Sequence, residues 1–209
     1  MRTLSLRFAT IVLGLIALPA FAQTTTGPVM PTAPAYPRVA LETSAGRIVI
    51  ELYTDKAPNT VANFLSYVKD GHYNGTVFHR VIADLLIQGG AFTPDMQQKP
   101  ERAPIANEAN NGLSNLRGTL AAARRPSEKN SATAQFFINT VDNRQFDYSS
   151  DASADASGYC VFGRVVEGLD VIDKIRTVAT AARAPFAANV PVAAIIVERA
   201  LVLDATSSP

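Results

Sequence analysis

The segment TVFHRVIADLLIQGG, residues 76–90, contains the side chains of this sequence best suited to chemistry on a bound molecule. Arg80 lies in an otherwise apolar run, and Gln88 follows it eight residues later, before paired glycines. An arginine is a permanently charged set of N–H donors, and a glutamine amide both donates and accepts hydrogen bonds. Taken singly, Arg80 could equally be a surface residue with a buried stem, and Gln88 a cap at a sheet edge.

Other common catalytic groups lack their sequence patterns. The two histidines, His72 and His79, are not spaced as zinc ligands, and the string GLSNL lacks the second glycine of a G-x-S-x-G nucleophile elbow. Neither a Walker loop nor G-x-G-x-x-G occurs, so phosphate and dinucleotide cofactors have no cradle. The single cysteine, Cys160, has the apolar neighbours of a buried thiol, with a reactive nucleophile as the alternative. We therefore expect neither a metal nor a cofactor.

Short apolar runs would position the candidate side chains if they form neighbouring strands. Because successive side chains of a strand point to opposite faces, Arg80 is expected on the face opposite its neighbours His79 and Val81. The runs 85–88 and 134–139 alternate in the same way. The predicted outer surface consists of Arg80, Leu86, Gln88, Gln135 and Phe137, and the predicted interior includes Ile87, Phe136 and Ile138.

The periodicity of the remaining sequence predicts the other elements. Apolar and polar residues alternate on both sides of SAG in RVALETSAGRIVIELY, which predicts a β-hairpin. Apolar residues recur at helical spacing from Val61 to Val68, which predicts a helix that begins at Pro58 and ends near Gly71. A second helix is predicted in GLDVIDKIRTV and a last strand in AAIIVERALVL. Further strands are predicted at 76–82, 85–88, 118–123, 134–139 and 159–165.

This order of elements indicates the fold class. Many short strands and two helices, without strand-helix-strand repetition, favour a mostly antiparallel sheet. Such a sheet is most economically closed into a barrel whose ends the helices cover. A sandwich is the alternative architecture.

Residues 1–22 have the pattern of a signal peptide. Arg2 and Arg7 precede the apolar stretch FATIVLGLIALPAFA, which is short for a membrane span and ends in the cleavage pattern of Ala20 and Ala22. An uncleaved membrane anchor is the alternative. Export suggests the periplasm of a Gram-negative cell as the location, with secretion beyond the envelope as the second possibility.

The mature chain should consist of a tether and one domain. Residues 23–37, rich in Thr and Pro, predict a flexible tether, and the domain is expected to span residues 38–205. The formal net charge of the whole chain is +1, from 19 basic and 18 acidic residues without long runs of either sign. That balance offers no footprint for nucleic acid or an anionic membrane. We therefore expect a protein that binds neither nucleic acid nor, after signal removal, a membrane. We also expect it to be a monomer.

Five motifs occur in the order found in the cyclophilins, a family of peptidyl-prolyl cis/trans isomerases. They are FHRVI, IQGG, NEANNGLSNLRGTLAAAR, SATAQFFINTVDN and GYCVFGRVVEGLDVIDKI, and the chain resembles this family over nearly all of residues 39–203. The resemblance implies a mainly β fold, a closed antiparallel eight-stranded barrel capped by two α-helices. It also implies rotation of X-Pro bonds in proline-containing polypeptides, and assistance to the folding of exported proteins.

The resemblance implies that Arg80 is the principal catalytic residue and that Gln88 holds both Arg80 and the peptide. His79, beside Arg80, could suggest general acid–base catalysis, but rotation about a bond requires no proton transfer. We therefore expect His79 to be structural. A chaperone module that binds proline peptides with little turnover is the alternative function, which Leu85 and Leu86 would permit.

The resemblance also implies a peptide groove with a pocket for proline. Its implied substrate-binding residues are Phe137, Leu85, Leu86, Gln135, Ala123, Arg124, Phe146 and Tyr159. Ala123 and Arg124 would bind the peptide through backbone groups, and Gln135 would add a polar contact.

Three departures from the family pattern concern this pocket. Leu85 and Leu86 stand where an aromatic residue followed by Met is common, so the proline pocket should be less aromatic. Gln145 stands where animal cyclophilins often have Trp. Tyr159 replaces a His common in those relatives, as it does in bacterial members.

Because of these departures, we predict weak binding of the cyclic peptide cyclosporin. Titration calorimetry on the mature protein measures this affinity. A nanomolar dissociation constant would contradict the prediction.

Overall fold

The computed structural model describes residues 36–203 of the chain. The predicted signal peptide, all of the predicted tether before residue 36, and residues 204 and 205 of the predicted domain lie outside these residues. None of the helices in the described part is long and apolar enough to cross a membrane. The first described strand begins at Arg38.

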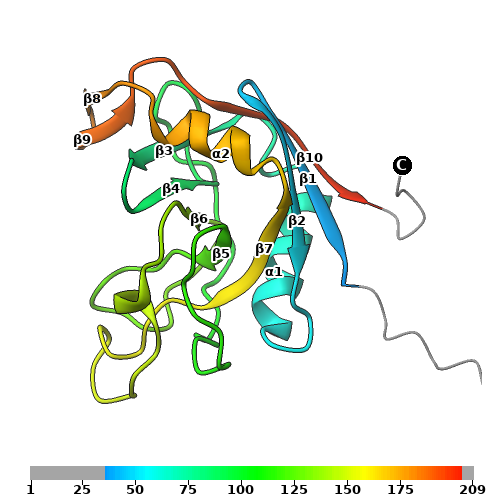
Figure 1. The fold of residues 1–209 in the computed structure, drawn as a ribbon, viewed down its shortest axis with the longest axis vertical. Helices are drawn as coiled ribbons and strands as arrows, with labels where there is room; N and C mark the ends of the chain where they lie inside the picture. Colours follow the sequence, from blue (N-terminus) through cyan, green and yellow to red (C-terminus); the bar gives the residue numbers. More distant parts are fainter. Residues whose placement is uncertain (1–35, 204–209) are drawn as a thin grey trace, which may run out of the picture. The chain divides into compact units, whose positions relative to one another are not determined.

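Eight strands close into a barrel in which every neighbouring pair is antiparallel (Figure 1). The strands are β1 (Arg38–Thr43), β2 (Gly46–Leu52), β3 (Thr76–Ile82), β4 (Leu86–Gly89), β5 (Thr119–Ala122), β6 (Phe136–Asn139), β7 (Val161–Glu167) and β10 (Ile196–Leu203). Around the barrel their order is β1-β10-β3-β4-β6-β5-β7-β2. The predicted closed barrel is therefore confirmed, and the alternative of a sandwich is wrong.

Two helices close the barrel at its two ends. α1 (Pro58–Lys69) follows β2, and α2 (Leu169–Arg176) follows β7. Because β2 and β7 are antiparallel neighbours, the two helices begin at opposite ends of the barrel (Figure 1). Both helices bury an apolar stripe in the barrel core, formed by Val61, Phe64 and Val68 of α1 and by Val171, Ile172 and Ile175 of α2.

A carboxylate from a distant loop caps α1. Ala57, at the N-cap position, has no side chain that could accept a hydrogen bond. Glu108 instead accepts from the backbone N–H groups of Asn59 (3.1 Å) and Thr60 (2.8 Å), and from both of their side chains. Its charge also lies at the positive end of the helix dipole. Glu108 thus fixes a long loop against the helix.

The barrel interior is apolar and holds the strands in register. Its fully buried side chains include Leu41, Ile48, Ile50, Leu52, Phe78, Ile87, Leu120, Phe136, Ile138 and Phe162. Each large side chain buried in this way contributes roughly 1.5 to 3 kcal/mol relative to exposure. A slip of one residue would turn every one of a strand's inward side chains outward, so the core specifies the pairing.

The sequence does not predict the two-stranded sheet of β8 (Thr180–Arg183) and β9 (Phe186–Pro191). All four residues of β8 are exposed, and the hairpin is rich in alanine, so it lacks an alternating apolar pattern. Phe186 and Val190 nevertheless pack outside the barrel on a cluster that includes Val77 of β3. The hairpin therefore covers the outer side of β3 at Val77 and leaves Arg80 partly exposed.

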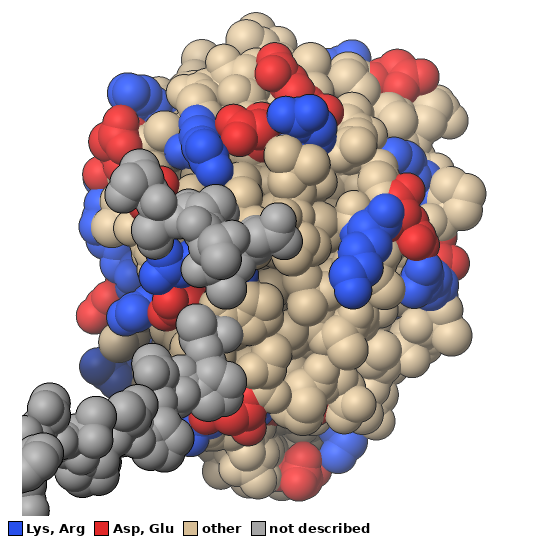
Figure 2. Space-filling view, turned by 90° about the vertical axis from the view of Figure 1, so that its right-hand side faces the viewer, with Lys and Arg blue, Asp and Glu red and all other residues tan. Residues whose placement is uncertain are grey.

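Charged side chains of both signs are interspersed on the face drawn in Figure 2. On the described surface, charged side chains pair with neighbours of opposite sign. Glu51 of β2, for example, pairs with Arg38 at 3.2 Å and with Arg164 at 3.1 Å. The face in Figure 2 offers no extended surface of one charge.

Candidate active site

Arg80, Gln88 and Gln135 form a chain of hydrogen bonds across three strands. β4 lies between β3 and β6, and the pairing sets Arg80 opposite Gln88 and Gln88 opposite Phe137. Arg80 Nη1 donates to Gln88 Oε1 over 3.3 Å, and Gln88 Nε2 donates to Gln135 Oε1 over 3.0 Å. The second bond turns the amide oxygen of Gln88 toward the arginine. These three residues share one outer surface, as the alternation of side chains predicts.

A β-bulge in β3 sets the direction of Arg80. Between Phe78 and Arg80 the pairing with β4 shifts, so His79 is an extra residue without an opposite partner. Phe78 and Val81 both join the barrel core, whereas His79 packs outside the barrel against Phe92. The prediction that His79 and Val81 share one face is therefore wrong, because alternation does not hold across a bulge.

His79 is a buried, uncharged ring. It stacks on Phe186 with ring centroids 5.2 Å apart and meets Phe92 edge-on at 4.8 Å. Burial, followed by the charge of Arg80, lowers the pKa of His79 to about 4. Within residues 36–203 its Nδ1 atom has no hydrogen-bond partner. The ring is thus uncharged at neutral pH and contacts the β8–β9 hairpin, in agreement with a structural role.

The apolar residues predicted for proline binding lie together in one cluster, named here the Phe137 cluster. Phe137 meets Phe146 at 5.9 Å and Tyr159 at 5.5 Å between ring centroids, both edge-on. Its buried members are Leu86, Ala121, Phe137 and Val161, and its partly exposed members are Leu85, Leu113, Ala123, Phe146 and Tyr159. The partly exposed rings of Phe146 and Tyr159 form an aromatic rim, and the buried side chains of Leu86 and Phe137 form the floor beneath it.

Three members of the Phe137 cluster, Ala121, Val161 and Leu113, were not predicted from the sequence. Ala121 of β5 and Val161 of β7 stand opposite each other in neighbouring strands. Extending the alternation to these strands would have found them, because the adjacent residues Leu120 and Phe162 point into the core. Leu113 lies in a loop without a periodic signal.

Buried asparagines hold the loops that carry Leu85 and Phe146. Asn143 Nδ2 donates to the carbonyl oxygen of Leu85 over 2.7 Å, next to the 3-10 turn η1 (Arg144–Phe146). Asn115 donates to Asp147 Oδ1 from its backbone (2.7 Å) and its side chain (3.0 Å). Satisfied buried polar groups of this kind are costly to displace, so they fix the rim of the Phe137 cluster.

A polar hollow of about 250 Å³ adjoins the two glutamines. It is lined by Gln88, Gln98, Glu101, Ala123, Arg124, Arg125, Ser131, Thr133 and Gln135. The backbone N–H of Ala123 already donates to the carbonyl oxygen of Gln135 over 3.0 Å. The backbone contact expected of Ala123 is therefore limited to its carbonyl oxygen. Arg124 lines the hollow, and its guanidinium lies over the ring of Tyr159.

Cys160 is a core thiol, as predicted. It is free, 2% exposed, and its sulfur lies 3.6 Å from the hydroxyl oxygen of Thr60. Burial raises the pKa of the Cys160 thiol to about 12, so it is not a nucleophile at neutral pH. Across residues 36–203, no three His, Cys, Asp or Glu side chains are grouped to hold a metal ion.

Comparison with known proteins gives matches over nearly all of the described domain. A family profile described as "Cyclophilin type peptidyl-prolyl cis-trans isomerase/CLD" matches residues 38–198. Peptidyl-prolyl cis-trans isomerase cyp18 of Streptomyces antibioticus is 54% identical over 165 residues, which cover 79% of this chain and 98% of that protein. Peptidyl-prolyl cis-trans isomerase B of Escherichia coli is 53% identical over 166 residues, covering 79% and 99%. Peptidyl-prolyl cis-trans isomerase A of Dickeya dadantii is 48% identical over 185 residues, covering 88% and 89%.

Solved structures share the fold. A cyclophilin type peptidyl-prolyl cis-trans isomerase of Cryptosporidium parvum matches with a TM-score of 0.65 and 21% identity, over 81% of this chain and 98% of that chain. Its structure in the presence of the dipeptide Ala-Pro matches with a TM-score of 0.65 and 22% identity, over 80% and 99%. At this identity the likeness concerns the arrangement of strands and helices.

We predict that His79 makes folding stability depend on pH. The folded pKa is about 4, whereas the ordinary value is 6.5, so the unfolded chain takes up a proton that the folded chain does not. This stabilisation is therefore fully present above pH 6.5 and is lost as the pH falls toward 4, by about 3 kcal/mol. Urea unfolding of the wild type and of His79→Phe, between about pH 7 and pH 4, measures the difference.

The pH dependence that remains in His79→Phe serves as the control, because it contains the contributions of all other titrating groups. His72, whose pKa is lowered chiefly by burial, gives a pH dependence of the same sign that remains in His79→Phe. Equal losses of stability in the two proteins would contradict the role of His79.

Proposed function

Since the chain belongs to the cyclophilin family of peptidyl-prolyl cis-trans isomerases, we propose that Arg80, Gln88, Gln135 and the Phe137 cluster form its active site. The chain is an enzyme of this class, and its substrates are proline-containing polypeptides. The observation that carries the assignment of the site is the hydrogen bond from Arg80 to Gln88 on an outer surface that continues into the Phe137 cluster.

The reaction is a rotation that makes and breaks no covalent bond. The peptide bond before proline has partial double-bond character, with a barrier of about 18 to 20 kcal/mol and exchange times of tens of seconds or more. At the top of the barrier amide resonance is lost, and the prolyl nitrogen carries a lone pair that accepts a hydrogen bond. A catalyst must stabilise this twisted state more than either planar state.

Arg80 would donate that hydrogen bond. A hydrogen bond to a charged group contributes roughly 1.5 to 3 kcal/mol net, which corresponds to about ten- to a hundredfold in rate. Gln88 holds one N–H of the guanidinium through its amide oxygen. Among residues 36–203 Arg80 forms no ion pair, so its charge remains available to the substrate.

Gln135 would position the peptide beside Arg80. Its side-chain oxygen accepts from Gln88, and its Nε2 group donates to no acceptor within the described domain. An amide N–H of this kind is suited to a backbone carbonyl oxygen of the substrate.

The Phe137 cluster would supply the remainder of the rate enhancement. An apolar site for the proline ring removes the amide from water, which favours the less dipolar twisted form. It also holds the ring still while the preceding residue turns. The buried floor formed by Leu86 and Phe137 provides the apolar surface, and the rim formed by Phe146 and Tyr159 holds the ring on it.

We predict that Arg80→Ala lowers kcat/KM for a proline peptide at least ten- to a hundredfold, because the donor to the prolyl nitrogen is lost. His79→Phe is the matched control, since it keeps a ring against Phe92 and Phe186 and should retain activity within a factor of about three. A protease-coupled isomerisation assay measures both variants.

Two results would contradict this assignment. An equal, complete loss in both variants would mean that the loss comes from the fold and not from the guanidinium. Tight binding of proline peptides by the wild type with little turnover would instead favour the chaperone module that Leu85 and Leu86 would permit.

We also propose that the enzyme is exported to the periplasm and assists the folding of exported proteins there as a monomer. The support is the sequence of residues 1–22, with Arg2 and Arg7, an apolar stretch and the cleavage pattern of Ala20 and Ala22. The Thr- and Pro-rich residues 23–37 would tether the domain. Secretion beyond the envelope is the alternative location.

Expression of the full chain in a Gram-negative host tests the export proposal. We expect the periplasmic fraction to contain a protein that begins at Gln23, as read from its intact mass. Replacing Ala20 and Ala22 by Leu should block cleavage, because signal peptidase requires small residues there. Recovery of the uncleaved wild-type chain from the cytosol would contradict the proposal.

A further inference from the structure

The guanidinium of Arg124 bonds four backbone carbonyl oxygens in separate parts of the chain. Its Nε donates to Gly158 (2.9 Å), and its Nη2 to Ala154 (2.6 Å). Its Nη1 donates to Arg125 (3.1 Å) and Pro126 (2.9 Å). The planar, branched donor set of arginine can reach these carbonyls at once, whereas the ammonium of lysine is a single point. Arg124 therefore joins the wall of the polar hollow to the loop 147–158.

The same guanidinium covers a residue of the proposed proline site. Arg124 Cζ lies 4.4 Å from the centroid of the Tyr159 ring, within the range of a cation–π interaction. The Tyr159 ring in turn meets Phe137 and Phe146 edge-on, at 5.5 Å and 5.2 Å. The guanidinium thus packs directly on one ring of the aromatic rim.

The loop 147–158 returns closely on itself at the point where Arg124 binds. Gly158 has φ +59°, and a Cβ atom there would lie 2.5 Å from the backbone nitrogen of Tyr148. Its carbonyl oxygen also accepts from Asn107 Nδ2 over 3.2 Å. Glycine is required by both the conformation and the close approach. The base of the loop is therefore tightly packed next to Tyr159.

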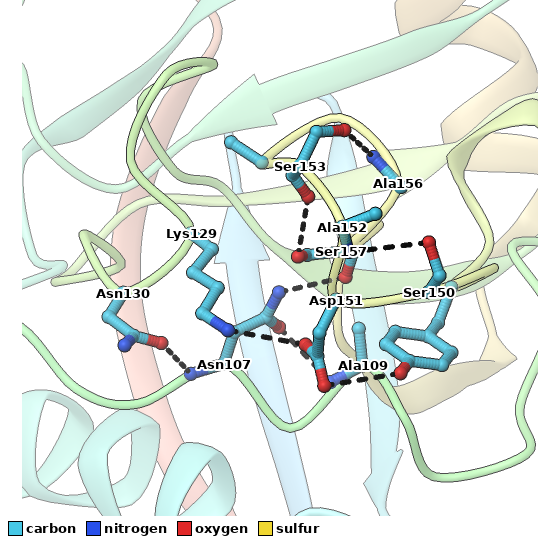
Figure 3. A network of polar contacts seen from close by, with 12 residues as sticks. Asn107, Ala109, Lys129, Asn130, Ser150, Asp151, Ala152, Ser153, Ala156 and Ser157 are labelled. Carbon is cyan, nitrogen blue, oxygen red and sulfur yellow. Dashed lines mark hydrogen bonds and ion pairs between the residues drawn. The ribbon is translucent and has the colours of Figure 1, made fainter.

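A second tie joins the loop 147–158 to Lys129, which is close in sequence to Arg124 (Figure 3). Lys129 Nζ pairs with Asp151 Oδ1 at 3.2 Å, with side chains 44% and 68% exposed. Asn107 Nδ2 donates to the carbonyl oxygen of Ser157 over 3.0 Å (Figure 3). The exposed pair contributes little to stability. Lys129 therefore provides a natural comparison with Arg124, because it ties the same loop without covering the rim.

We propose that the Arg124 side chain is a positioning residue for substrate binding: it fixes the Tyr159 rim and the 124–126 wall, and links their order to the loop 147–158. This inference rests on the proposed active site. The guanidinium does not touch the rotating bond, and it lies over the rim residue Tyr159, not over the floor of Leu86 and Phe137. The rim holds the proline ring, whose place is the same in the planar and twisted states. Loss of the guanidinium should therefore weaken binding without slowing the bound substrate.

Initial isomerisation rates over a range of peptide concentrations separate the two effects. For Arg124→Ala we expect KM to rise about tenfold and kcat to remain within a factor of about two. Lys129→Ala should leave both constants within a factor of about two of the wild type. If Arg124→Ala does not fold, Arg124→Met keeps the aliphatic stem without the donors and is measured in its place.

The result distinguishes this inference from the proposed function. An unchanged KM, a fall of kcat equal to the rise of KM, or an equal effect of Lys129→Ala would each overturn the role of Arg124. Absence of isomerase activity in the wild type would instead overturn the proposed site. In that case calorimetric titration with a proline peptide decides the role of Arg124, which requires about tenfold weaker binding in Arg124→Ala and unchanged binding in Lys129→Ala.

Discussion

The hydrogen bond from Arg80 to Gln88 depends on a single register of three strands. A one-residue slip of β4 would exchange Gln88 for Ile87 on the outer face and place an amide in the core. Ile87, Phe136 and Ile138 prevent the slip, because each is almost fully buried inside the barrel. The packing of the interior therefore determines the chemistry available on the outside. The bulge at His79 is part of the same constraint, because it directs two successive side chains away from the core.

Arg80 is held by a neutral partner, and this choice matters for its charge. A carboxylate in place of Gln88 would form an ion pair with the guanidinium and weaken its attraction for a substrate lone pair. The amide oxygen of Gln88 orients the side chain while leaving its net charge intact. His79, the neighbouring residue in the bulge, is kept uncharged by burial, so it adds no competing cation. His79 is uncharged because it is packed among apolar rings, and Arg80 is held by the amides of Gln88 and Gln135. The charge of Arg80 therefore remains available to the substrate.

Much of the fold could be predicted because the alternation of apolar and polar residues in a strand shows which of its faces is buried. Alternation at β1, β2, β3, β4, β6 and β10 and helical spacing in α1 indicated the elements, and shared faces placed Arg80 with Gln88. The β8–β9 hairpin was beyond such reasoning, because its sequence is rich in alanine, and of its strands Phe186 and Val190 join a hydrophobic cluster without forming an alternating pattern. The bulge depends on the partner strand and not on the residues FHR themselves.

For the site, periodicity alone gave positions, and the family resemblance supplied roles. Leu113 was not predicted because it lies in a loop, where no periodic pattern shows which side chains will be buried together. The use of the Arg124 side chain was missed for a related reason. Its four acceptors are backbone carbonyls, which every residue has, so no sequence pattern marks them. The catalytic and binding roles of the site residues stay predictions.

The placement of Cys160 matters when a proline-containing substrate also contains cysteines. Such substrates expose thiols and labile disulfides, and exchange begins with attack by a thiolate. Beside Thr60 in the hydrophobic core, the sulfur of Cys160 is both protonated and inaccessible. Once folded, the protein can therefore bind cysteine-containing substrates repeatedly without forming a disulfide bond to any of them.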